Sequence, residues 1–171
     1  MNWKHPIAAV VFWIAAIGQL AAAAPNEFAS WVDYRSPDGV FSLSFPSAPV
    51  VSSRTISGPA APVHLTEIKT SNGAFGLVIH QLASAGSVSG DPLDYMTRPN
   101  REGRTVDYVK IISLGPVPGR EMLSLQEGIW VRERLYWFEN RLYNLIALSR
   151  TKNEGQEIDR HFFESFRLSS K

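Results

Sequence analysis

Apolar and small polar residues alternate along much of this chain, and that alternation is typical of β-strands with one buried face. Residues 40–45 alternate valine, phenylalanine and leucine with serine, and Pro46 ends the run. The preceding Pro37-Asp38-Gly39 favours a turn, because proline sets φ and the next two residues tolerate a sharp bend. Residues 50–56 are expected to form an edge strand.

A first hairpin is predicted where residues 63–71 and 74–82 flank Asn72-Gly73. This dipeptide readily takes the two positive φ values of a type I′ turn. The resulting register places His64 and His80 on opposite faces of the sheet. The two histidines therefore cannot share a metal ion within this hairpin.

A second hairpin is predicted from residues 128–138 and 141–150, which are rich in aromatic and branched side chains around Glu139-Asn140. Both of its faces carry large apolar residues. We therefore expect it to lie centrally in the sheet, covered at least partly on both sides. Residues 108–114 and 120–126 read as two further strands around a turn at 115–119.

Two helices are predicted among these strands. Asp91-Pro92 combines an N-cap with a first helical residue, and Pro99 should end that short helix. Residues 100–107 then form a charged surface loop. Asn153 caps a final helix whose apolar stripe packs on the sheet and comprises Ile158, Phe162, Phe163 and Phe166.

The expected fold class is therefore α+β, a central and mostly antiparallel β-sheet flanked by helices. The residues expected in its core are Phe41, Leu43, Phe45, Ile68, Leu77, Ile79, Val131, Leu135, Trp137, Ile146, Phe162 and Phe166.

The first 23 residues have the pattern of a secretory signal peptide. Lys4 lies in a short basic start, an apolar run of about 14 residues follows, and alanines at 21 and 23 fit a small-x-small cleavage site. The run is shorter than the ~20 residues of a membrane-spanning helix. We expect cleavage after Ala23 and a periplasmic or secreted product; an uncleaved segment would instead tether the protein to a membrane.

Composition excludes several classes of function. The chain has 17 basic and 16 acidic side chains, so no global field attracts nucleic acid or anionic lipid. It has no cysteine, which excludes disulfides, thiolate metal sites and thiol catalysis. No histidine pattern typical of a metal site is present, and we expect neither a metal nor a cofactor.

Four stretches resemble the Mog1/PsbP-like α/β/α sandwich family in its exported bacterial branch. They are Phe41-Ser42-Leu43-Ser44-Phe45-Pro46, Pro118-Gly119-Arg120-Glu121, Asn140-Arg141-Leu142-Tyr143-Asn144-Leu145 and Ser165-Phe166-Arg167-Leu168. None is a catalytic signature. The resemblance implies non-enzymatic partner binding and one domain over residues 37–171, after a leader at 24–36 that follows the signal segment.

One face of the second hairpin is the candidate binding site. Two guanidinium groups among flat aromatic rings could hold a carboxylate, a phosphate or a sugar. Pairing of the arginines with acids across the sheet would be the structural alternative. The residues of this face are Trp130, Arg132, Arg134, Tyr136 and Tyr143.

Enzymatic alternatives are weaker. Gly86-Ser87-Val88-Ser89-Gly90 only imitates a hydrolase elbow, since its central residue is Val88. His161 lies four residues after Glu157, where a carboxylate could orient an imidazole base, but the same spacing suits a surface pair.

The expected function is that of an exported, non-catalytic accessory or binding protein. Its partner would be an unknown protein or a small anionic ligand of the cell envelope, with no role for nucleic acid and contact with a membrane only if the signal segment is retained. The rival hypothesis is a small envelope hydrolase with His161 or His80 as base.

Overall fold

Alternating side chains build most of this protein from antiparallel strands. The computed structural model describes residues 31–56, 62–82, 91–98, 103–152 and 156–169. The expected signal peptide, the serine-glycine loop at 83–90 and the Asn153 cap lie outside the described residues.

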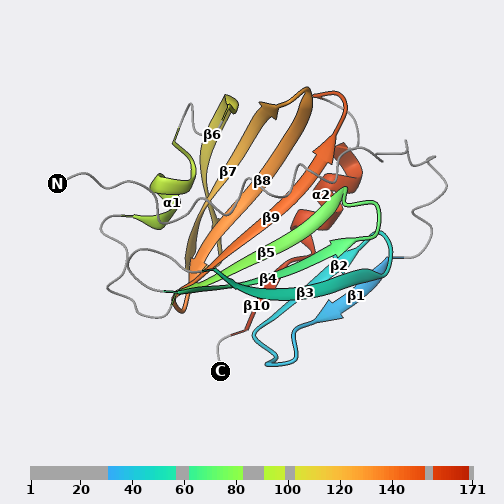
Figure 1. Cartoon of the computed structure of the whole chain (residues 1–171), viewed down its shortest axis with the longest axis vertical. Coiled ribbons are helices and arrows are strands. Elements are labelled where there is room, and N and C mark those ends of the chain that lie inside the picture. The colour runs from blue at the N-terminus through green and yellow to red at the C-terminus, as the bar shows by residue number, and fades with distance from the viewer. Residues whose placement is uncertain (1–30, 57–61, 83–90, 99–102, 153–155, 170–171) are drawn as a thin grey trace.

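The described part of the chain contains ten strands and two short helices (Figure 1). In chain order they are β1 (Val32–Arg35), β2 (Phe41–Phe45), β3 (Pro49–Ile56), β4 (Val63–Thr70), β5 (Phe75–Leu82), α1 (Pro92–Met96), β6 (Thr105–Leu114), β7 (Val117–Gln126), β8 (Ile129–Phe138), β9 (Arg141–Ser149), α2 (Gln156–Glu164) and β10 (Arg167–Leu168).

Seven strands form one large antiparallel sheet in the order β3-β4-β5-β9-β8-β7-β6. Both predicted hairpins are confirmed in their registers: Leu65 lies opposite His80, and Phe138 lies opposite Arg141. The second hairpin is central, as expected, because β9 pairs with β5 and β8 pairs with β7.

The two hairpin turns differ from each other. Glu139 and Asn140 both have positive φ, at 48° and 60°, as a two-residue type I′ turn requires. At the first hairpin only Gly73 has positive φ, so the type I′ prediction there is wrong. The Asn72 side chain instead accepts a hydrogen bond from the Ala74 amide at 3.0 Å and closes a longer turn.

A small sheet in the order β1-β2-β10 packs together with α2 against one face of the large sheet, here called the inner face. The main hydrophobic core lies between these layers. It includes Phe45 and Phe166, which are fully buried, with Phe162 between Phe45 and Phe75 at ring distances of 5.5 and 5.2 Å. Aromatic rings from both sheets and α2 therefore form one core.

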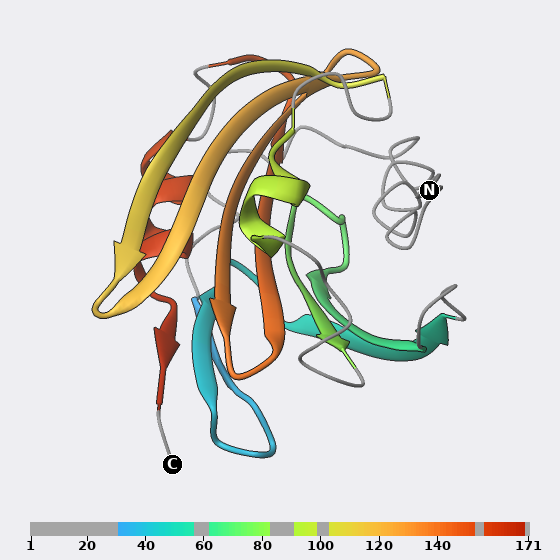
Figure 2. The same ribbon diagram turned by 90° about the vertical axis from the view of Figure 1, so that its left-hand side faces the viewer.

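The opposite, outer face of the large sheet carries α1. Figure 2 shows the two helices on opposite faces of this sheet. Asp91 caps α1 as predicted, accepting a hydrogen bond from the Leu93 amide at 2.8 Å, and the helix ends at Met96. Leu93 and Met96 pack on Leu135 and Leu142.

The expected α+β class is wrong, because the described part is mostly β-structure in two sheets. The two helices span five and nine residues, too little to flank a sheet of seven strands. Much of the layer on the inner face is the small sheet. Its strand β1 lies in the segment that we expected to be a leader, and β10 follows α2.

Two smaller expectations also need correction. Strand β6 begins at Thr105, and Arg104 before it is only 6% exposed, so the described end of the 100–107 segment is not a surface loop. The turn expected over 115–119 is confined to Gly115-Pro116, because β7 starts at Val117. Of the expected core residues, all are buried except Trp137, which is partly exposed.

Candidate functional site

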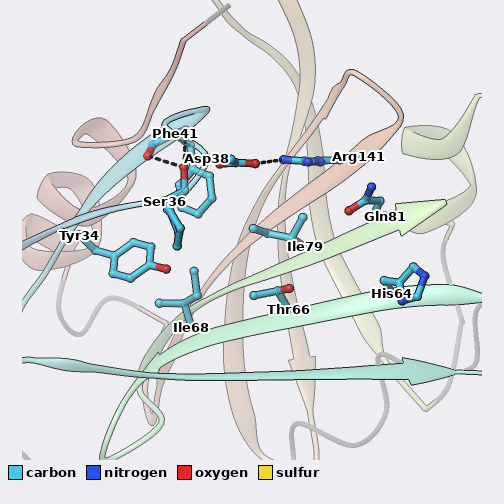
Figure 3. A pocket seen from close by; sticks show the side chains of 11 residues that line it. Tyr34, Ser36, Asp38, Phe41, His64, Thr66, Ile68, Ile79, Gln81 and Arg141 are labelled. Carbon is cyan, nitrogen blue, oxygen red and sulfur yellow. Dashed lines mark hydrogen bonds and ion pairs between the residues drawn. The ribbon is translucent and has the colours of Figure 1, made fainter. Parts of the chain in front are cut away.

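A cleft opens between the small sheet and the inner face of β4, β5 and β9 (Figure 3). Its volume is about 240 Å³. Side chains of β1, β2 and the turn that joins them form one wall. The lining residues are Tyr34, Ser36, Pro37, Asp38, Phe41, His64, Thr66, Ile68, Ile79, Gln81 and Arg141.

Strand alternation explains the floor of this cleft. His64, Thr66 and Ile68 are alternate residues of β4 and therefore face the same side. Thr66 lies opposite Ile79, while Gln81 lies opposite both His64 and Arg141. The floor is therefore apolar at Ile68 and Ile79 and polar at the end where β4, β5 and β9 present His64, Gln81 and Arg141.

An ion pair bridges the two sheets across the cleft. Arg141 Nη1 donates to Asp38 Oδ2 at 2.7 Å, and the Val40 amide donates to Asp38 Oδ1 at 3.2 Å. The hydrogen bond from Arg141 holds the pKa of Asp38 well below its usual range, at about 2. Asp38 is therefore ionised at any physiological pH and neutralises the guanidinium group.

The turn before β2 positions Asp38. Gly39 has φ of +73°, which permits the bend that was predicted from Pro37-Asp38-Gly39. The Ser36 hydroxyl donates to the Phe41 carbonyl and accepts from the Phe41 amide, which fixes the two ends of the turn together. The carboxylate is thus held by local backbone geometry as well as by Arg141.

Two side-chain hydrogen bonds between β3 and β4 continue the polar surface of the cleft onto β3. Thr55 Oγ1 lies 2.8 Å from His64 Nδ1, and Ser53 Oγ lies 3.2 Å from Thr66 Oγ1. On the opposite wall, Tyr34 is partly exposed with its hydroxyl pointing into the cleft in Figure 3. Burial raises the pKa of this phenol, so it stays protonated and can donate a hydrogen bond.

The residues predicted as a binding face do share one face of β8 and β9, but both arginines are paired with acids. Arg132 Nε lies 3.3 Å from Asp159 Oδ2 on α2, and Arg132 Nη1 donates to the Tyr108 hydroxyl at 3.0 Å. Arg134 Nε donates to Glu121 Oε2 at 2.7 Å.

The aromatic members of that face are mostly buried. Tyr143 is fully buried, and Tyr136 stacks on Phe166 at 5.7 Å. Trp130 is partly exposed, with Lys152 Nζ 5.6 Å above its ring. This arrangement favours the structural role of cross-sheet pairing, and ligand binding at this face stays a prediction.

The proposed catalytic histidines are far from an active-site arrangement. His161 is exposed and packs on the Trp31 ring at 4.1 Å, while the exposed Glu157 approaches Arg160 at 4.0 Å. His80 is buried on the outer face of β5. Within the described residues, no three histidine or acidic side chains converge as a metal site would require.

Sequence reasoning missed a buried charge network on the outer face of the sheet. Arg104 Nη1 donates to Glu133 Oε2 at 3.0 Å, and Asn144 Nδ2 donates to Glu133 Oε1 at 2.9 Å. The available signal was the position of Glu133 and Asn144 among the apolar residues of that strand face, namely Val131, Leu135, Leu142 and Ile146. A charge inside such a stripe needs a partner.

These two layers define a PsbP-like fold. The solution structure of cyanobacterial PsbP from Synechocystis is similar, with a TM-score of 0.53 and 6% identity, over 88% of this chain and 99% of that one. The expected likeness to PsbP is therefore confirmed for the fold alone, and membership of an exported bacterial branch stays a prediction.

A crystal structure of a protein of unknown function from Pseudomonas aeruginosa matches 78% of this chain and 92% of its own chain. The identity is 15% and the TM-score is 0.39, too low a similarity to assign a fold or a function. No protein-family model and no curated protein matches the sequence. Among the described residues, no helix has the length and apolar character needed to span a membrane.

Proposed function

We propose that this protein is an exported, non-catalytic binding protein whose cleft holds a small uncharged polar group of a cell-envelope component. The proposal of export rests on the amino-terminal pattern of basic, apolar and small residues. The PsbP-like fold supports an accessory role loosely, since a fold alone does not assign a function.

The observation that carries the proposal is the internal neutralisation of the cleft. Asp38 and Arg141 cancel each other's charge at 2.7 Å, so neither an anion nor a cation gains a net attraction. The remaining rim offers hydroxyl, amide and imidazole groups over a floor that includes Ile68 and Ile79. Such a surface suits a ligand that is both polar and uncharged.

The size of the cleft also bears on the ligand. Its volume of about 240 Å³ lies below the ~300–1,000 Å³ of sites that enclose a drug-sized molecule. The cleft therefore accommodates one ring or one residue of a larger molecule rather than a whole cofactor.

Affinity capture from envelope extract tests this function. The immobilised protein should retain a component that Thr66→Trp loses, because an indole at position 66 would fill the cleft. Ser52→Trp is the matched control, since Ser52 is exposed on the outer face of β3, opposite Glu67. Equal retention by the wild type and both variants, all shown to be folded by circular dichroism, would rule out the cleft as the binding site.

A further inference from the structure

We infer that the group bound in the cleft is one uncharged sugar ring of an envelope glycan. This inference rests on the proposed function and names the chemistry of its ligand. It depends on three features of the cleft: its fixed charges, the planar polar groups on its rim and the aromatic ring on its wall.

The fixed charges disfavour ionic ligands of either sign. Asp38 is ionised and its side chain is 36% exposed, so an incoming carboxylate or phosphate would meet a negative charge beside Arg141. An ammonium group would meet the guanidinium group 2.7 Å from the same carboxylate. A neutral ligand meets no such repulsion, and it can hydrogen-bond to both charged groups.

Planar polar groups on the rim match neighbouring hydroxyl groups. Asp38 accepts, Arg141 donates through several N–H groups, and the Gln81 amide offers both functions. Figure 3 shows Gln81 between Arg141 and His64, so donors and acceptors lie side by side. Adjacent hydroxyls of a sugar, each of which both donates and accepts, can use such an alternating set.

The wall formed by β1 supplies apolar surface that the C–H face of a sugar ring can cover. Ile68, Ile79 and Phe41 line the cleft but are almost wholly buried, whereas the partly exposed Tyr34 stands beside Ile68 in Figure 3. The Tyr34 ring is partly exposed and packs on the buried Phe41 ring at a centroid distance of 5.9 Å, which fixes its position in the wall. Aromatic residues give apolar contact area while the Tyr34 hydroxyl remains available for a hydrogen bond.

A peptide backbone is a poorer match to the floor. An extended peptide binds best along an open strand edge, where it completes the backbone hydrogen bonds of a sheet. Strand β4 already pairs with β3 and β5, and β5 already pairs with β4 and β9. The floor therefore presents side chains to a ligand, and no unpaired strand edge.

Chemical-shift titration of the isotopically labelled protein tests the inference. The probes are glucose, N-acetylglucosamine and the neutral dipeptide unit N-acetylalanine N-methylamide, each added to millimolar concentration. We expect at least one sugar to shift the amides of Thr66, Ile79 and Arg141 saturably. Gln81→Ala should lower the affinity of the protein for that sugar about fivefold, which is the effect of losing one hydrogen bond. Arg54→Ala, on the outer face, should leave the affinity for the sugar unchanged.

The outcomes separate the inference from the function on which it rests. If the dipeptide shifts these amides and neither sugar does, the cleft remains a binding site and the inference of a sugar ring is wrong. If no probe shifts them while envelope capture still depends on Thr66, the sugar inference is wrong and the proposed function stands. Sugar shifts that lie elsewhere, or that survive Gln81→Ala unchanged, also contradict the inference.

Discussion

At the scale of single residues, the least expected feature is the charge at Glu133 inside the outer face of the sheet. Its side chain is 2% exposed, and its carboxylate accepts one hydrogen bond from Arg104 and one from Asn144. Burying a carboxylate costs free energy unless such partners compensate for the lost water. The network is therefore conditional: each member is tolerated only while the others are present.

Replacing Glu133 with alanine should destabilise the protein by about 3–5 kcal/mol, because Arg104 would be left as a buried charge without its carboxylate. Urea unfolding measures this change. The matched control is Glu67→Ala, which breaks the pair with Arg54, whose side chain is 47% exposed, and should cost less than about 1 kcal/mol. Similar losses in the two variants would contradict the burial argument.

Asp159 on α2 should make stability depend on pH. Burial raises its pKa from 3.8 to about 6, although Arg132 acts in the opposite direction. Between those pH values the native state binds more protons than the unfolded state, so the contribution of Asp159 to the free energy of unfolding falls as pH rises towards 6. Asp159→Asn should remove this slope, as measured by urea unfolding between pH 4 and 7. An unchanged slope in the variant would assign the pH dependence to other groups.

At the scale of elements, hairpins were the most predictable features, because alternation and a short turn together determine which residues face each other. The register around Glu139-Asn140 and that around Asn72-Gly73 both follow from the sequence. The conformation of the first turn did not follow, since the Asn72 side chain caps the turn by hydrogen bonding to Ala74. That choice depends on local contacts that a dipeptide preference does not describe.

Candidate-site residues were less predictable than hairpins. Alternation correctly grouped Arg132, Arg134, Tyr136 and Tyr143 on one face, but the acids that pair with the arginines come from β7 and α2. The cleft likewise depends on Asp38 meeting Arg141 across 103 residues of chain. Such partners are set by packing between elements, which single-sequence periodicity does not encode.

Strand β6 ends the large sheet and exposes apolar side chains. Ile111 is 82% exposed and Val109 is 40% exposed on this edge strand. Exposed apolar edge strands favour association between molecules. Ile111→Thr should therefore reduce self-association at high concentration, measured by sedimentation velocity, while changing stability by less than about 0.5 kcal/mol.

Ile112→Thr is the control for that prediction. Ile112 is the next residue on β6, but its partly buried side chain packs against the main core, so a hydroxyl in its place should destabilise the protein by about 1–3 kcal/mol. If Ile111→Thr destabilises the protein as much as Ile112→Thr does, or if the variant self-associates as much as the wild type, then the exposed apolar edge of β6 does not drive self-association.

At the scale of the whole molecule, the fold class was mispredicted because of the short strands of the small sheet. Strand β1 has four residues and β10 has two, which is too short for a period-2 pattern to stand out. Both are held by pairing with β2, and that pairing brings together segments from the two ends of the described chain. The sequence indicates the apolar faces but not that a second sheet covers one of them.

The shared aromatic core predicts that the two sheets unfold together. Phe166 is fully buried. Its ring centroid lies 6.2 Å from that of Phe41 in the small sheet and 5.7 Å from those of Tyr136 and Tyr143 in the large sheet. Phe166→Ala should cost about 3–5 kcal/mol by opening a cavity at this junction. Because both sheets contribute to that cavity, backbone circular dichroism and aromatic absorbance should report one coincident transition in the wild type and in the variant. A separate early transition, in which aromatic signals change while most strand structure persists, would show that the small sheet and α2 detach as a unit, and that the core couples the layers less than their packing indicates.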